Sequence, residues 1–247
     1  MRTAFFIKLF TAILISHYGN ILAAADAEGI LNRMGDVLFA CEDQKSVVVI
    51  ILADRDGNQR RREAQVWQKG TDKHLFRFTA PASEAGIALL SLPDDILYLY
   101  MPAYGRERRI ASHMKSQSFA GTDLSYEDLE IHKYTEDFSA KLIETTLSHY
   151  VLELTPEQGV RSDYSRIVAY VNTDHYYPEI MKTYDRRGQE YKVIEYVFDN
   201  KDNYWFAREI HIANLKRDHS TQMIFQETEF DTGIPDEVFS IRNLTRN

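Results

Sequence analysis

The sequence predicts a mainly β, α+β protein built on one antiparallel sheet that curls toward a barrel. About ten or eleven segments after Ser46 are rich in β-branched and aromatic residues, and short polar turns separate many of them. No linker, repeat or low-complexity stretch interrupts residues 26–247. Because meandering strands of this kind bury their apolar faces best when the sheet closes on itself, we expect a single domain over residues 26–247.

The first 25 residues have the pattern of a secretory signal peptide. Arg2 and Lys8 flank a short apolar run over residues 5–15, and small residues end the segment at Ala25. A charged start, an apolar run too short to span a bilayer and an A-x-A end are typical of a cleaved leader. We expect cleavage after Ala25 and export of the mature chain, with an uncleaved anchor as the alternative.

Charge and cysteine content exclude several classes of function. Removing residues 1–25 takes away two positive charges and no negative one, so the formal net charge falls from −8 to −10. Phosphate neutralisation dominates nucleic-acid affinity, so an acidic chain is a poor nucleic-acid binder. Cys41 is the only cysteine, which excludes an intramolecular disulfide and a thiolate metal cluster.

One helix is expected at residues 26–40, before the strands begin. Its apolar residues fall on one helical face, and Asp26 is placed to cap its N-terminus. That face consists of Ile30, Leu31, Met34, Val37 and Leu38.

Strand patterns then follow in order along the chain. In the first half they cover residues 47–52, 62–69, 74–80, 87–92 and 96–101. The last two are apolar on both faces, which predicts strands covered on each side. In the second half the strands are expected at residues 150–154, 164–172, 179–185, 190–198, 205–214 and 221–229.

Aromatic residues concentrate in these later strands. Large rings on a curved sheet bury apolar area efficiently, so they either fill the core or line an interior cavity, and composition leaves both open. The cluster comprises Tyr170, Tyr184, Tyr191, Tyr196, Phe198, Tyr204, Trp205, Phe206 and Phe225.

The sequence offers little support for catalysis, a cofactor or a metal. It contains no HExxH, GxSxG, GxGxxG or P-loop motif. Asp94 and Asp95 fit a turn. Ser125 and Asp128 have the spacing of a capping box, which gives the Glu127-Asp128 pair a structural explanation.

A basic run stands out in this acidic chain. It contains Arg106, Arg108, Arg109 and Lys115. Solvated surface charge explains it, and docking of lipid phosphates or of an acidic partner is the alternative, because guanidinium groups bind phosphate oxygens bidentately.

Three stretches together resemble a known family. Residues 98–103 (YLYMPA), 106–110 (RERRI) and 118–129 (SFAGTDLSYEDL) are similar to the signature of the outer-membrane lipoprotein-sorting-like proteins. These are relatives of the periplasmic lipoprotein carrier and the outer-membrane receptor of the Lol system. Residues 234–239 and Leu244 resemble that family's closing segment, and Ala120 departs from the bulkier residue common there.

The resemblance implies a half-open β-barrel, with short helices packed in or over its opening and an apolar cavity for acyl chains. It supplies no catalytic residue. The candidate cavity residues are Phe76, Phe78, Leu89, Leu97, Leu99, Met101, Tyr170, Met181, Val193, Phe206 and Phe225. The candidate residues of the family-motif loop are Phe119, Gly121, Asp123, Ser125, Tyr126 and Asp128.

Within that loop, Gly121 is expected to allow a turn, and Asp123 and Ser125 to satisfy N–H groups where a helix begins. We expect a monomeric, non-enzymatic periplasmic protein that binds lipid acyl chains or lipoprotein, with an inner-membrane transporter as a possible partner. The alternative is an interaction module that docks on an envelope transporter without carrying lipid. A hydrolase acting through Asp123 or Glu127 is the weakest alternative.

Overall fold

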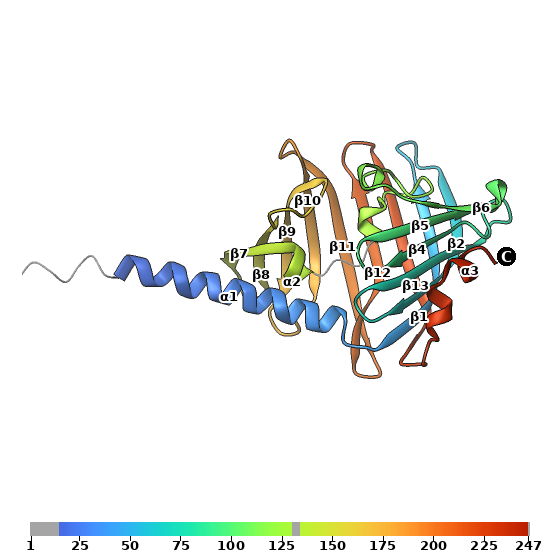
Figure 1. Cartoon of the computed structure of the whole chain (residues 1–247). Helices are drawn as coiled ribbons and strands as arrows, with labels where there is room; N and C mark the ends of the chain where they lie inside the picture. Colours follow the sequence, from blue (N-terminus) through green and yellow to red (C-terminus); the bar gives the residue numbers. More distant parts are fainter. Residues whose placement is uncertain (1–14, 130–133, 247) are drawn as a thin grey trace, which may run out of the picture.

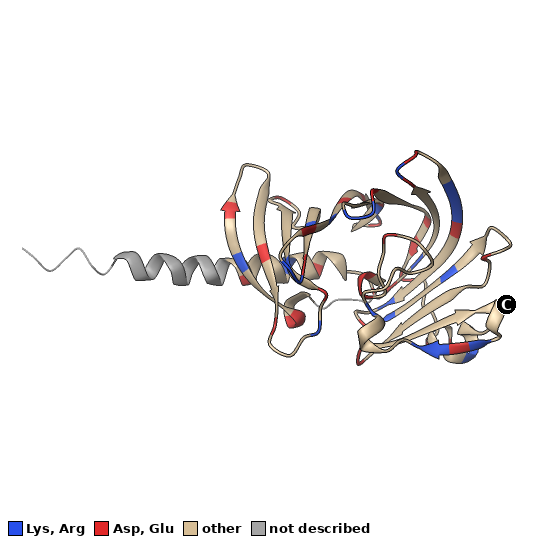
Figure 2. Cartoon of the chain, turned by 90° about the horizontal axis from the view of Figure 1, so that it is seen from above, with Lys and Arg blue, Asp and Glu red and all other residues tan. Residues whose placement is uncertain are grey.

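The computed structural model describes residues 15–129 and 134–246, and these form one antiparallel sheet of thirteen strands (Figure 1). The spatial order is β6-β5-β4-β3-β2-β1-β13-β12-β11-β10-β9-β8-β7. Strands β1–β6 form a first wing and β7–β13 a second wing, and β1 pairs with β13 where the wings meet. Seen from above, the two wings curve around the chain segment that passes between them (Figure 2). The predicted curved antiparallel sheet is confirmed.

The first wing contains every strand expected in the first half of the chain. Its members are β1 (Asp43–Ala53), β2 (Gln59–Lys69), β3 (Lys73–Ala80), β4 (Ala88–Leu92), β5 (Ile96–Met101) and β6 (Arg106–Arg109). Short 3-10 helices, η1 (Pro102–Tyr104) and η2 (Ser112–Met114), flank β6. Asp94 and Asp95 both have positive φ, 62° and 56°, in the β4–β5 turn, so their predicted turn role is confirmed.

The second wing likewise contains the six strands expected there, preceded by one more. Its members are β7 (Phe138–Thr145), β8 (His149–Pro156), β9 (Tyr164–Asn172), β10 (Pro178–Asp185), β11 (Glu190–Lys201), β12 (Tyr204–Asn214) and β13 (His219–Phe230). The additions are the two edge strands, β6 and β7. All four residues of β6 are exposed, and β7 is mostly exposed, so neither has the apolar pattern that reveals a strand.

Helix α1 (Ile15–Leu38) packs against β7 and the short helix α2 (Tyr134–Asp137) on the inner side of the second wing (Figure 1). Ile30, Leu31 and Met34 are buried, as the helical periodicity predicts. Asp26 lies within α1, so the expectation that it caps the helix is wrong. None of the helices in residues 15–129 and 134–246 combines the length and apolar character needed to cross a bilayer.

The inner core centres on Phe119, which the motif loop (residues 118–129) inserts between the wings. Its ring centroid lies 5.4 Å from that of Phe76 and 5.6 Å from that of Phe78. Buried aromatic pairs of this geometry contribute about 0.5–1.5 kcal/mol beyond their area burial.

A closing segment (residues 232–246) covers the outer face of β3–β5. It contains η4 (Asp236–Phe239) and α3 (Ile241–Leu244), and its Phe239 and Leu244 pack with Leu75 and Leu90. The Asp43 carboxylate anchors the start of the segment, because it accepts bonds from the backbone N–H groups of residues 232 and 234. The expectation that β4 and β5 are covered on both faces is confirmed.

Replacing Phe239 with alanine should lower the free energy of unfolding by about 3–5 kcal/mol, because the change leaves a cavity over β4. Ile241→Ala is the matched control in the same segment, since Ile241 is 38% exposed. It should cost less than about 1 kcal/mol. Urea unfolding followed by tryptophan fluorescence measures both variants, and equal losses would show that the segment does not act as a packed cover.

Candidate functional site

The concave side of the sheet holds an apolar cavity of about 270 Å³. Its walls come from β1–β3, from β10–β13, from the end of α1 and from the motif loop. Phe198, Trp205 and Phe230 line it at the edge of the sheet near the β11–β12 turn. Leu124 and Asp128 of the motif loop line the inner end. The cavity therefore runs from one sheet edge to the loop that passes between the wings.

Half-buried rings form the rim of this cavity. The Tyr177 ring stacks on Phe198 with centroids 4.4 Å apart, and its centroid lies 5.1 Å from that of Trp205. Phe206 meets Phe230 edge to face at 5.5 Å. Such rings offer apolar area with little side-chain freedom to lose on binding, which suits contact with a flexible hydrocarbon chain.

Four of the eleven predicted cavity residues line the cavity. They are Phe76, Met181, Phe206 and Phe225. The aromatic cluster noted in the sequence contributes further, because Tyr196, Phe198, Tyr204 and Trp205 also line it.

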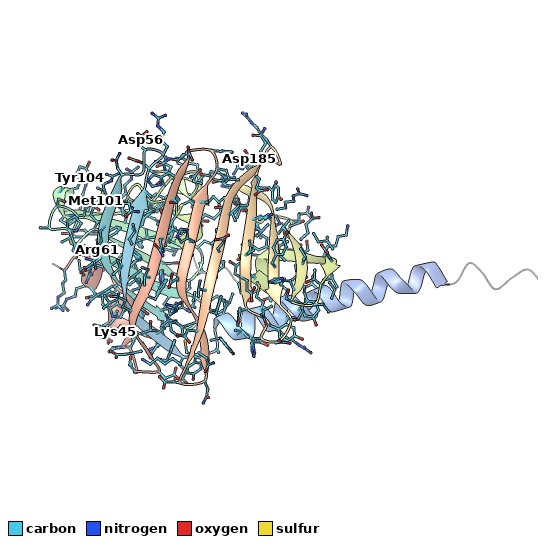
Figure 3. All side chains as sticks on the ribbon, turned by 180° about the vertical axis from the view of Figure 1, so that it is seen from behind. Lys45, Asp56, Arg61, Met101, Tyr104 and Asp185 are labelled. Atoms are coloured by element: carbon cyan, nitrogen blue, oxygen red, sulfur yellow. The ribbon has the colours of Figure 1, made fainter. Side chains whose placement is uncertain are left out.

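The other seven lie elsewhere. Phe78, Leu89 and Leu97 are buried in the packed inner core and do not line the cavity. Leu99 also packs against that core. Met101 lies near Tyr104 at the margin of the first wing (Figure 3).

Tyr170 and Val193 face the outside of the sheet. Their strand neighbours Ala169 and Ile194 belong to the inner core, and successive residues of a strand point to opposite faces. Both strands are apolar on each face here, so the sequence does not indicate which set points inward.

The motif loop begins a short 3-10 helix, η3 (Glu127–Leu129). The Ser125 N–H donates to the Asp128 carboxylate at 2.7 Å, and the Asp128 N–H donates to the Ser125 hydroxyl at 3.2 Å. This reciprocal pair is the predicted capping box, which is confirmed. Gly121 has φ 76°, a left-handed conformation that favours glycine. Phe119 and Tyr126 are buried.

Asp128 also takes part in a buried ion pair that sequence reasoning missed. Its Oδ2 lies 2.5 Å from Nζ of Lys192 on β11, and its Oδ1 accepts from the Tyr164 hydroxyl at 2.6 Å. The Lys192 ammonium also donates to the Tyr164 oxygen at 2.9 Å. The Lys192 side chain is 1% exposed and that of Asp128 is 9% exposed. A lone lysine in a strand gives no signal in the sequence that its partner is 64 residues away.

These contacts determine the protonation states within the network. Burial raises the pKa of Asp128, but the attraction of Lys192 and hydrogen bonds from Lys192, Tyr164 and Ser125 outweigh it, so its pKa lies below the ordinary value. Burial, together with the nearby Asp128 charge, raises the pKa of Tyr164 well above its usual range. The carboxylate is therefore ionised and the phenol protonated at neutral pH.

The two remaining acidic groups of the loop also have structural partners. Glu127 accepts bonds from the Ser162 hydroxyl at 2.5 Å and the Asp163 N–H at 3.1 Å. Asp123 binds β13: its Oδ2 accepts from the Thr221 hydroxyl at 2.8 Å and lies 2.5 Å from His219 Nδ1. Asp123 thus ties the loop to the sheet, which corrects the expectation that it caps a helix.

The predicted docking residues lie away from the cavity. Arg106, Arg108 and Arg109 are exposed on the edge strand β6 (Figure 2). Lys115 is half-buried, and its backbone carbonyl accepts from the Glu127 N–H at 2.9 Å. Charged edge strands also resist edge-to-edge pairing with other sheets, so position alone leaves the role of these arginines open.

Two titratable side chains along the cavity are uncharged at neutral pH. Burial lowers the pKa of His74 to about 4, so its ring is neutral. Burial and the Asp231 charge raise the pKa of Cys41 to about 11, so it is a thiol. In the part of the chain that the structure describes, no three His, Cys, Asp or Glu side chains are grouped to hold a metal ion. The geometry favours binding of an apolar ligand.

Comparison with known proteins gives matches to families and to solved structures. A family model described as "-like: Uncharacterized protein" matches residues 70–246. A crystal structure of an outer membrane lipoprotein-sorting protein domain from Vibrio parahaemolyticus is 26% identical with a TM-score of 0.83, over 90% of this chain and 100% of that one. No curated protein matches the chain.

Two further solved structures resemble it. A DUF1329 family protein from Desulfovibrio piger is 25% identical with a TM-score of 0.84, over 90% of this chain and 99% of that one. A LolA superfamily protein from Nitrosomonas europaea is 24% identical with a TM-score of 0.73, over 87% and 97% of the two chains, and shows the fold alone. These matches confirm the family resemblance drawn from the sequence motifs.

Replacing Lys192 with methionine should lower the free energy of unfolding by about 3–5 kcal/mol, because it leaves the Asp128 carboxylate buried without a cation. Lys182→Met is the matched control. Lys182 lies on the neighbouring strand β10, where its ammonium sits 5.6 Å from the outward-facing Tyr170 ring. Chemical denaturation compares the two, and a Lys192 variant no less stable than the Lys182 variant would refute the role of the pair.

Acid should weaken the same interaction. The pKa of Asp128 is lower in the folded protein than in the unfolded chain. Its contribution to the free energy of unfolding is therefore complete above the pKa of the unfolded chain, about 4. That contribution is lost as the pH falls through the pKa of the folded protein. The stability difference between wild type and Asp128→Asn should therefore shrink below about pH 4. Asp94→Asn, in an exposed turn, serves as control, and a difference independent of pH would contradict the assignment.

Proposed function

Since this chain belongs to the outer-membrane lipoprotein-sorting-like family, we propose that it is a periplasmic carrier that shields lipid or lipoprotein acyl chains during transport to, or maintenance of, the outer membrane. The observation that carries the proposal is the apolar cavity of about 270 Å³ with its aromatic rim. Most of the lining side chains are aromatic or aliphatic, and the polar ones, such as Gln44 and Gln68, are a minority. Such a cavity suits a hydrocarbon chain.

The energetics support an acyl chain as ligand. Each methylene moved from water into the cavity contributes about 0.8 kcal/mol. The rim rings and the inner residues Ile210 and Met223 supply apolar contact along the whole path. Since the inner end stops at Asp128, a charged carboxylate at the buried tip of a ligand would be repelled. The chain would therefore enter with its methyl end first.

The state of the polar groups supports a carrier without covalent chemistry. His74 is neutral, Cys41 is protonated, and the acidic side chains Asp123, Glu127 and Asp128 are each bound by other parts of the fold. None of these acids is presented to the cavity as a free general base. A hydrolase acting through Asp123 or Glu127 finds no support in this arrangement.

Export through a leader at residues 1–25 belongs to the same proposal. Cleavage after Ala25 would leave residues 26–38 of α1, and these include the buried Ile30, Leu31 and Met34. The shortened helix would keep its packing against β7 and its contribution to the cavity wall. The exposed arginines of β6 remain candidates for docking on a transporter, but the open cavity favours a carrier over a module that only docks.

Replacing Phe225 with arginine should reduce binding of a fluorescent fatty-acyl probe at least tenfold, because it places a charge in the cavity wall. Val197→Arg is the matched control: Val197 is 46% exposed on β11, between Tyr196 and Phe198, which line the cavity. It should bind the probe like wild type. Circular dichroism checks that both variants are folded.

Native mass spectrometry of protein purified from membranes gives an independent test, and bound lipid is expected. Protein that is always free of lipid, together with no binding of the acyl probe, would reject the carrier function.

A further inference from the structure

A second pocket, of about 370 Å³, shares no lining residue with the apolar cavity, and the motif loop contributes to both. The turns β8–β9, β10–β11 and β12–β13 surround it, because alternate turns of an antiparallel meander lie at the same sheet edge. In Figure 1 the last two turns stand at the upper edge, and Figure 3 labels Asp185 there. Ser125 of the motif loop and Tyr164 contribute to its lining.

The lining of this basic pocket carries more positive than negative charge. Its cations are Arg186, Arg187, Lys216 and Arg217, and its anions are Asp163 and Asp185. The four cations come from two separate turns, in a chain whose net charge is −8. The overall composition of this acidic chain therefore does not explain why four basic side chains lie together at this pocket.

Two of the cations are already paired. Arg186 lies 2.8 Å from Asp163, and Lys216 binds Asp185. That hydrogen bond from Lys216, with others from backbone N–H groups, lowers the pKa of Asp185 to about 2, so this carboxylate stays ionised and its charge is matched. Among the described residues, Arg187 and Arg217 have no side-chain partner, so two guanidinium groups remain available at the pocket.

The lining also includes Tyr164 and Ser125, but their hydroxyls belong to the Asp128 network. The Tyr164 hydroxyl donates to Asp128, and the Ser125 hydroxyl accepts from the Asp128 N–H. The Tyr191 ring forms part of the wall and holds the Lys216 ammonium 4.6 Å from its centroid. Two unpaired guanidinium groups, on two turns of the same sheet edge, match a phosphate group, because its oxygens accept bidentate hydrogen bonds from arginine.

We propose that the basic pocket binds a phosphate group, as a monoester or a diester, through Arg187 and Arg217. The pocket and the apolar cavity share no lining residue, so a phosphate here and an acyl chain there would be separate occupants. The proposal therefore stands or falls independently of the carrier function. The phosphate could belong to a lipid headgroup or to a free small molecule.

The test compares Arg187→Gln/Arg217→Gln with Arg242→Gln/Arg246→Gln, which removes the same charge from the exposed end of the closing segment. Inorganic phosphate is titrated by calorimetry. Co-sedimentation uses vesicles of phosphatidylglycerol mixed with phosphatidylcholine, against phosphatidylcholine alone. We expect the pocket variant to lose at least tenfold in affinity for whichever probe binds, and the closing-segment variant to stay within twofold of wild type.

Binding of inorganic phosphate identifies a small-molecule source, and binding of the anionic vesicles alone identifies a lipid headgroup. Either result supports the site if the loss is confined to the pocket variant. The proposal is overturned if neither probe binds, if the pocket variant binds like wild type, or if both variants lose affinity equally. Acyl-probe binding should be unchanged in the pocket variant, which separates this test from that of the carrier function.

Discussion

The buried contact between Asp128 and Lys192 ties the motif loop to the second wing. The chain builds β1–β6, crosses the interior, and then builds β7–β13 back to β1. A loop that crosses an interior must satisfy its polar groups there, because water is excluded. Here the carboxylate of Asp128 caps its own short helix and also binds Lys192 and Tyr164 of the second wing. An ion pair removed from water is strong only when every remaining polar atom is bound, and this network approaches that condition.

The same network separates two chemically different compartments. On one side, Asp128 ends a cavity whose other walls are mainly rings and aliphatic side chains. On the other side, Ser125 and Tyr164 line a pocket dominated by arginine and lysine. One protein could thus bind an apolar chain in the apolar cavity and a charged group in the basic pocket. The ionised and neutral groups are placed by folding before any ligand arrives, so little reorganisation is needed on binding.

Predictions from short sequence patterns were confirmed where the structure depends on residues that are close together in the sequence. The strands of both wings, the turn at Asp94 and Asp95, and the capping box at Ser125 and Asp128 depend on neighbours within a few residues, and all are present. The edge strands β6 and β7 were missed for the opposite reason. An edge strand takes its partner from only one side and meets solvent on the other, so its residues need not be apolar.

The sequence by itself determined the curved antiparallel sheet, its turns, the buried motif loop and the family, because these follow from periodicity, turn chemistry and short motifs. Only the tertiary structure decided which face of each strand points inward. Val193 and Tyr170 are apolar or aromatic yet face outward, while Lys192 is charged yet fully buried. The physical reason is that a strand apolar on both faces leaves its orientation to long-range packing. The partner of Lys192, the cavity and the cluster of basic turns all depend on residues that only folding brings together.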